Sequence, residues 1–156
     1  MWRAIPLTII ALLTPGLAAG VNVLKQPKAV GYRAERCSYQ TRAQRVSCSG
    51  NVVVTREDVR ISCQRLEAEL DAAGRIVKLE CHDQVEIVTQ SRVARSDQAR
   101  YDANSDELTL DGNARVAQGQ SRLAGQVIVL DLETGDLQVQ GKVRGVLGPE
   151  VVGGKK

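Results

Sequence analysis

An internal repeat is the feature that most constrains the fold of this chain. The segment 39–70 aligns without a gap on the segment 101–132, with matched positions 62 residues apart. The matched pairs include Tyr39 with Tyr101, Val46 with Leu108, Gly50-Asn51 with Gly112-Asn113, Arg60 with Arg122, Gln64 with Gln126, and Leu70 with Leu132. Two further units, at 83–87 and 141–143, give a period of about 30 residues, which is typical of stacked supersecondary units that cannot bury their apolar faces alone.

Within each unit, apolar residues recur at every second position. This alternation is clear at 108–110, 114–116, 128–132 and 137–139, and it predicts half-buried antiparallel strands separated by turns rich in Gly, Asn and Asp. The two Gly-Asn pairs fall inside such runs, where Gly favours a bulge or a sharp bend. The segment 64–70 alone resembles a helix fragment, but its repeat partner 126–132 has a strong strand pattern. We therefore predict strands for both segments.

The composition predicts one folded domain with an aliphatic core. The 156 residues are 43% hydrophobic and 25% charged, which excludes a disordered tail or a fibrous protein. Aromatic residues make up only 3%, with no Phe and a single Trp at position 2. Val, Ile, Leu and Ala must therefore form the core.

The first 20 residues predict a secretory signal peptide. One positive charge at Arg3 precedes a short apolar run, and small residues follow Pro15-Gly16. The alternative is an uncleaved membrane anchor, but the run is shorter than the roughly 20 residues that span a bilayer. We expect residues 21–31 to form an N-terminal extension, residues 32–147 to form the β domain and residues 148–156 to form a flexible tail.

Four cysteines in an exported chain indicate disulfide bonds, and sequence alone allows three connectivities. A hairpin centred between Arg42 and Ala43 places Cys37 opposite Cys48. A hairpin about Ala72 places Cys63 opposite Cys81, so two local bridges are favoured over free structural thiols. A metal site is not predicted, because the chain has one His and lacks paired ligand spacing.

The second half of the repeat resembles a known family. Its pattern runs from Tyr101 through Leu108-Thr109-Leu110-Asp111-Gly112-Asn113 and Val116 to Arg122-Leu123, Gly125, Ile128, Leu130, Leu132, Gly135, Leu137, Val139 and Gly141. In order and spacing it closely resembles the lipopolysaccharide-transport periplasmic proteins of the LptA/OstA type, over residues 32–147. The resemblance implies an all-β fold, a single OstA-like β-jellyroll of many short antiparallel strands.

The same resemblance implies a periplasmic carrier that holds the acyl chains of lipopolysaccharide and bridges the inner and outer membranes. Its implied partners are lipopolysaccharide, inner-membrane anchored and outer-membrane transport components, and further copies stacked end to end. The candidate groove residues are Val52, Val54, Ile61, Leu66, Ile87, Leu108, Leu110, Val116, Leu123, Ile128, Leu130, Leu137 and Val139. The alternative is that these residues only pack against one another as a closed core.

Charge is distributed unevenly along the chain. Residues 25–66 carry nine Lys or Arg against three acids, whereas residues 67–142 carry eight against fourteen. We hypothesise that the basic half contacts lipid phosphates or an acidic end of the next subunit; a solvated face is the alternative. The candidate contact residues are Arg33, Arg36, Arg42, Arg45, Arg56 and Arg60.

No enzymatic function is predicted. The single His82, the absence of a Gly-x-Ser-x-Gly motif and the absence of a phosphate-binding glycine loop give no catalytic residues and no cofactor. Basic residues are not interleaved with aromatic ones, which disfavours nucleic-acid binding. Two alternatives to the carrier are its membrane-anchored LptC-like partner and a disulfide-stapled structural or interaction module of the envelope that binds no lipid.

Overall fold

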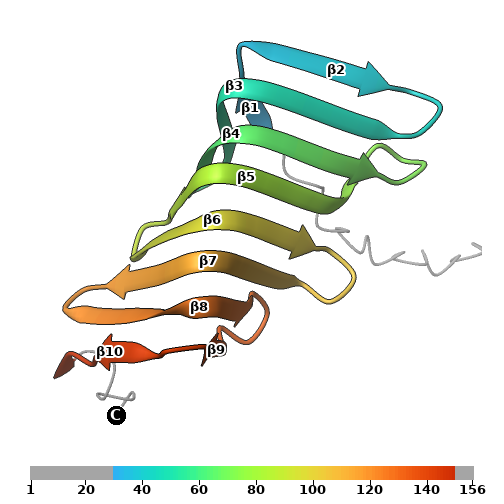
Figure 1. Cartoon of the computed structure of the whole chain (residues 1–156). Helices are drawn as coiled ribbons and strands as arrows, with labels where there is room; N and C mark the ends of the chain where they lie inside the picture. The colour runs from blue at the N-terminus through green and yellow to red at the C-terminus, as the bar shows by residue number, and fades with distance from the viewer. Residues whose placement is uncertain (1–29, 150–156) are drawn as a thin grey trace, which may run out of the picture.

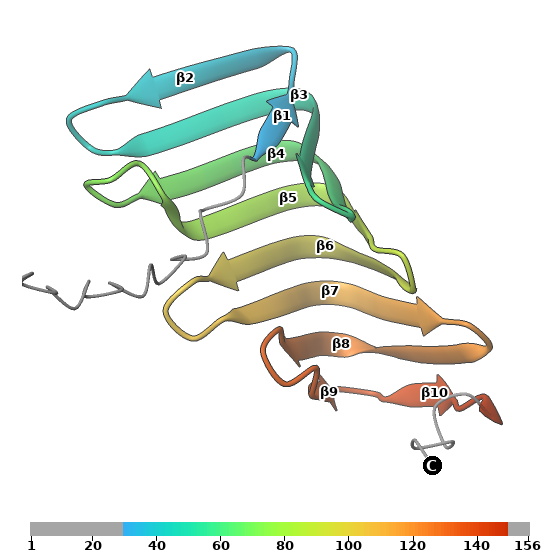
Figure 2. The same cartoon turned by 180° about the vertical axis from the view of Figure 1, so that it is seen from behind.

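Alternating apolar and polar residues form one antiparallel sheet in the computed structural model, which describes residues 30–149. The ten strands are β1 (Gly31–Arg33), β2 (Arg36–Gln40), β3 (Arg45–Arg56), β4 (Val59–Leu70), β5 (Ile76–Val88), β6 (Arg92–Asp102), β7 (Glu107–Gln118), β8 (Ser121–Asp131), β9 (Leu137–Gln140) and β10 (Arg144–Val146). Figures 1 and 2 show them stacked in chain order from β2 to β10. Strands fill both helix-ambiguous segments, 64–70 and its repeat partner 126–132, almost completely.

The six long strands β3 to β8 each cross a bend near their middle, so the sheet has two arms. The first arm contains β2 and β9, together with the halves of β3 to β8 that lie in the same cross-strand rows. The second arm contains β1 and β10, together with the other halves of β3 to β8. Both short strands at each end pair with a single long strand, β3 at one end and β8 at the other. This bent, stacked sheet is the β-jellyroll that the resemblance implied, although its central strands are long and bent rather than short.

The bends follow the predicted repeat. Gly50-Asn51, Asp83-Gln84, Gly112-Asn113 and Gly141-Lys142 all have positive φ values, between 47° and 80°. In β3, β5 and β7 the pair faces a single residue of a neighbouring strand, as in a β-bulge. The predicted bulges are therefore confirmed, and the period of about 30 residues marks the spacing between successive bends.

Neighbouring strands supply carboxylates that hold two of these bends. Asn51 Nδ2 donates a hydrogen bond to Glu35 Oε1 (2.7 Å), and Asn113 Nδ2 donates to Asp97 Oδ2 (2.9 Å). The same carboxylates occupy the space that a Cβ at Gly50 or Gly112 would need, at 2.4 and 2.5 Å. Each Gly-Asn pair thus combines a left-handed backbone with a close side-chain contact, which explains the residue types.

Inward-pointing aliphatic side chains of both arms form one core. Its largest fully buried side chains are Leu110, Ile128, Val52 and Val85, together with Cys81. Within residues 30–149 no helix is long and apolar enough to cross a membrane. The predicted signal peptide at 1–20, most of the extension at 21–31 and most of the tail at 148–156 lie outside the described residues, and these boundaries stay predictions.

Candidate functional site

The candidate groove residues all point to the inner face of the bent sheet. Eight are buried, namely Val52, Val54, Leu66, Ile87, Leu108, Leu110, Val116 and Ile128. The others are partly buried: Ile61, Leu130, Leu137 and Val139 pack against the core, and Leu123 is half-buried. They share this face because every second residue of a strand points to the same side of the sheet, and cross-strand partners such as Leu110 and Ile128 point to the same side as each other. Contact of these residues with lipid stays a prediction.

Small residues near the bend were missed by the sequence analysis. Cys63, Ser96 and Ala114 are buried just past the bend in the second arm, and Ala99 is buried just before it in the first. Inward side chains converge on the inside of a bend, so large residues would not fit there. The strand alternation, continued with the register shift at each bend, would have identified these positions.

Two tyrosines link the arms at the N-terminal end of the inner face. Tyr32 lies on β1 in the second arm and Tyr39 on β2 in the first, and their hydroxyl groups hydrogen-bond to each other. The ring centroids are 6.5 Å apart, with 57° between the ring planes. This bond raises the pKa of Tyr39 above its ordinary value, because it stabilises the protonated hydroxyl. The two rings therefore bridge this end of the inner face.

The C-terminal end of the sheet has a different character. Large apolar side chains are exposed there at Leu132, Val143, Val146 and Leu147. They lie around β9 and β10, the last strands of the stack in Figure 1. The two ends of the sheet thus differ chemically, with a tyrosine pair at one and exposed aliphatic groups at the other.

The disulfide prediction is half correct. Cys37 and Cys48 are directly opposite on β2 and β3 and form a disulfide, as the hairpin argument predicted. Cys63 and Cys81 are free buried thiols, so the second predicted bridge is wrong. The β4–β5 hairpin turns over 71–75, and its register shifts between Glu69 and Leu70, so Cys81 faces Leu66 instead of Cys63.

The thiol pair is nevertheless in contact. A hydrogen bond to Cys63, together with burial, raises the pKa of Cys81 far above that of an ordinary thiol. Cys63 in turn donates a hydrogen bond to the carbonyl oxygen of Arg65 at 3.2 Å. The same contact with Cys81 lowers the pKa of Cys63, because it stabilises the Cys63 thiolate, so only the Cys81 thiol is held in the protonated form.

The six candidate arginines do not form one cluster. Arg33 and Arg60 share the outer face of the second arm, whereas Arg36 and Arg45 lie on the outer face of the first. Arg45 is paired with Glu69 at 2.8 Å. The remaining two lie apart from these four, Arg42 in the β2–β3 turn and Arg56 at the end of β3. The six arginines are therefore divided between the two arms, and their contact with lipid phosphates or with the next subunit stays a prediction.

Metal-ligating residues are not grouped in the part of the chain that the structure describes. Across residues 30–149, no set of three or more His, Cys, Asp or Glu side chains is placed to hold an ion. His82 Nε2 lies 3.5 Å from Glu80 Oε2 on the outside of the sheet. This contact is a surface pair of the ordinary kind.

A bent antiparallel sheet with a continuous aliphatic inner face defines the chain as an open β-jellyroll. The family model described as LptA/(LptD N-terminal domain) LPS transport protein matches residues 33–136, so the chain belongs to this family. A solved structure, LptH, the LptA homologous periplasmic component of the lipopolysaccharide transport device of Pseudomonas aeruginosa, has the same fold with a TM-score of 0.72. The match has 14% identity and covers 78% of this chain and 96% of LptH. No curated protein matches the sequence.

Proposed function

We propose that the protein carries lipopolysaccharide through the periplasm, with the acyl chains held along the inner face of the sheet. Membership of the LPS-transport family supports the substrate. The observation that carries the proposal is the inner face itself, which is mostly aliphatic from β3 to β9, with Tyr101 as the one aromatic side chain of those strands. Flexible acyl chains can lie against such a surface and meet few rigid rings between its two ends. No catalytic step belongs to this proposal.

Lipid entry on this proposal requires the two arms to separate. Leu110 and Ile128 are 1% and 0% exposed, because the inner side chains pack against one another. An acyl chain must replace these contacts with its own, at little cost since both are apolar. The sheet can open in this way because the backbones of the two arms are joined only where β3 to β8 cross the bend.

The proposed carrier acts as one segment of a bridge between inner-membrane anchored and outer-membrane transport components. Support comes from the free strand edges at both ends: in the described residues β2 pairs only with β3, and β9 pairs only with β8. Unpaired edges accept a further strand from another chain. End-to-end addition of copies or of a related domain would thus extend the inner face.

Photo-crosslinking tests the carrier function. A photoreactive residue at Leu110 or Ile128, which face inward, should give adducts with lipopolysaccharide. Matched controls at Thr109 and Val129 occupy the adjacent cross-strand pair on the outer face and should give none. Adducts from the outer pair alone, or none from several inward positions, would favour the structural module that binds no lipid.

The membrane-anchored partner is the second candidate, and its leader stays attached. N-terminal sequencing of the protein recovered from the cell envelope separates the two candidates. A mature chain that begins near residue 20 supports the soluble carrier. Retention of residues 1–20 supports the anchored partner.

A further inference from the structure

Six arginines gather on the outer face of the second arm. Two cross-strand rows of outward residues run there from β1 to β10, one through Arg33, Glu86, Arg95, Arg115 and Arg144, and the other through Arg60 and Arg122. All six guanidinium side chains are exposed. Glu86 is the only acid in these two rows, and Arg95 pairs with it at 2.7 Å. We call the two rows the basic face.

This arrangement was not evident from the sequence, because the arginines of the basic face come from both halves of the chain. Four of its arginines, Arg95, Arg115, Arg122 and Arg144, lie after residue 66, outside the basic segment of the sequence. In the folded protein, these positive charges are therefore grouped on one arm of the sheet and not in one half of the sequence. The other acids near the second arm lie at its two margins, outside the two rows: Glu57 and Asp58 in the β3–β4 turn at its tip, and Glu35, Asp83 and Asp97 at the bend.

Like charges face each other at the centre of the basic face. Arg95 is directly opposite Arg115 across β6 and β7, and only Arg95 has an ion-pair partner among the described residues of the face. Like charges at directly opposite positions destabilise a sheet. An anion that contacts both guanidinium groups would remove this repulsion.

The outer face of the first arm is different, because it carries charges of both signs. Arg45 pairs with Glu69 at 2.8 Å and Arg65 with Asp83 at 2.9 Å. That face carries seven acids against five Lys or Arg, and Asp102, Glu107 and Asp131 are consecutive cross-strand partners on it. A second copy of the chain is therefore the alternative occupant of the basic face, and the experiment below distinguishes it from a membrane.

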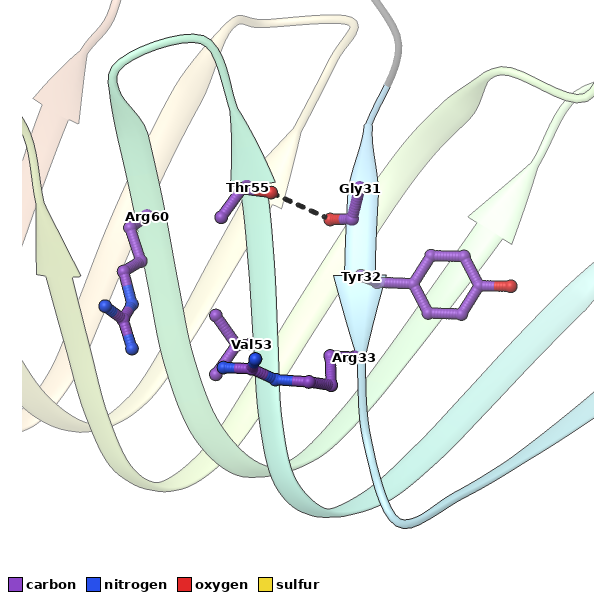
Figure 3. Close-up of a pocket in the computed structure, with 6 residues that line it drawn as sticks. All are labelled: Gly31, Tyr32, Arg33, Val53, Thr55 and Arg60. Carbon is purple, nitrogen blue, oxygen red and sulfur yellow. Dashed lines mark hydrogen bonds between the residues drawn. The ribbon is translucent and has the colours of Figure 1, made fainter.

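A hollow in the basic face has the chemistry of a phosphate site. It is about 320 Å³ in volume and lies between Arg33 and Arg60, above Val53 and Thr55. Figure 3 shows these two arginines extending on the same side of the sheet, whereas Tyr32 points to the other side. Guanidinium groups bind phosphate oxygens in a bidentate manner, whereas the Thr55 hydroxyl donates to the carbonyl oxygen of Gly31 at 3.5 Å.

Aliphatic residues lie between the arginines. Val88 and Val93 are cross-strand partners in the Arg60 row and are half-buried, and exposed Val146 faces Arg122. A surface of guanidinium and aliphatic groups suits the boundary between lipid headgroups and acyl chains, where charge meets phosphate and apolar groups avoid water.

We propose that the basic face docks the protein side-on to a membrane surface by binding the phosphates of anionic lipid headgroups. The inner face lies on the opposite side of the same arm and stays available for cargo. The docking site is therefore separate from the groove, and it brings the carrier to a membrane from which lipid enters or leaves. The inference goes beyond the proposed carriage of lipopolysaccharide and does not depend on it.

Vesicle co-sedimentation tests the proposal with the full mature chain. The vesicles contain either phosphatidylcholine alone or an equal mixture of phosphatidylcholine and phosphatidylglycerol. The wild-type protein should bind the mixed vesicles, and added salt should weaken this binding. The double variant Arg95→Gln/Arg115→Gln should bind them with an affinity lower by at least about tenfold. The matched control Arg65→Gln/Arg100→Gln removes the same charge from the outer face of the first arm and should stay within about twofold of the wild type.

Each outcome decides the matter. Equal losses in the two double variants would show attraction by net charge alone and overturn the proposal. Absence of wild-type binding to the anionic vesicles would do the same. A change of oligomeric state in Arg95→Gln/Arg115→Gln without a change in vesicle binding would assign the face to a contact between copies. Crosslinking of lipopolysaccharide from Leu110 is measured on the same variants and reports the groove independently.

Discussion

The hydroxyl groups of Tyr32 and Tyr39 hydrogen-bond to each other across the N-terminal end of the inner face. They come from different arms, so this hydrogen bond joins parts of the sheet whose backbones are continuous only through the bend. Opening of the arms for cargo at this end must break the bond or carry both rings aside. The tyrosine pair is thus a direct reporter of the closed state.

Photo-oxidation should convert this pair into dityrosine within one chain. The rings lie with their centroids 6.5 Å apart, so only a small movement brings them together. Dityrosine fluorescence should appear in the wild type, persist in Tyr101→Phe and disappear in Tyr39→Phe. A comparable yield in Tyr39→Phe would show that the bridge does not form. Lipid that opens the arms should lower the wild-type yield.

The same bond makes the ionisation of Tyr39 depend on its partner. The hydrogen bond that Tyr39 donates to Tyr32 raises the pKa of Tyr39, so its stabilisation is present below the unfolded pKa of about 10 and is lost as pH rises through the folded pKa. Absorbance titration of Tyr101→Phe should therefore end at higher pH than titration of Tyr32→Phe/Tyr101→Phe. Identical curves would contradict the bond.

Gly112→Ala should destabilise the bend more than Gly74→Ala destabilises a turn. Both glycines have similar left-handed φ values, +79° and +77°, so both substitutions cost about 1–2 kcal/mol of backbone strain. Only at Gly112 would the new Cβ meet another group, Asp97 Oδ2 at 2.5 Å, with nothing within 4 Å at Gly74. Urea unfolding followed by circular dichroism measures the difference, and equal losses would show that Asp97 moves freely aside.

The sequence predicted the inner face well because strand alternation and the repeat are local patterns. Once Gly50-Asn51 and Gly112-Asn113 were interpreted as bulges, every candidate groove residue fell on the inner side. The β2–β3 hairpin was equally predictable, because its four-residue turn left the register of Cys37 and Cys48 intact.

Features that depend on several strands were not predictable. The register of β4 and β5 follows from a turn over 71–75 and from an irregularity at Glu69 and Leu70, and these together place Cys81 opposite Leu66 instead of Cys63. The basic face requires residues from β1, β4, β6, β7, β8 and β10 to come together, so charge counted along the chain misplaced it. Strand order and register, not composition, decide both features.

Leu110→Ala should create a cavity in the inner face. Leu110 is 1% exposed and pairs with fully buried Ile128, so the loss should be about 2–5 kcal/mol of unfolding free energy. Thr109→Ala, at the neighbouring position on the outer face, should cost at most about 1 kcal/mol. Urea unfolding of both variants checks this, and a similar small loss in each would mean that the inner side chains are loosely packed.

Thiol titration should find two free thiols per chain, and only after unfolding. Cys63 and Cys81 are 3% and 0% exposed, and the raised pKa of Cys81 keeps its thiol protonated at neutral pH. Without reductant, a maleimide should not label the native protein and should label two cysteines in denaturant. Cys81→Ala should lower this count to one, whereas Cys37→Ser should raise it to three by releasing Cys48 from its disulfide. A count of zero in the denatured wild type would show that Cys63 and Cys81 are joined after all.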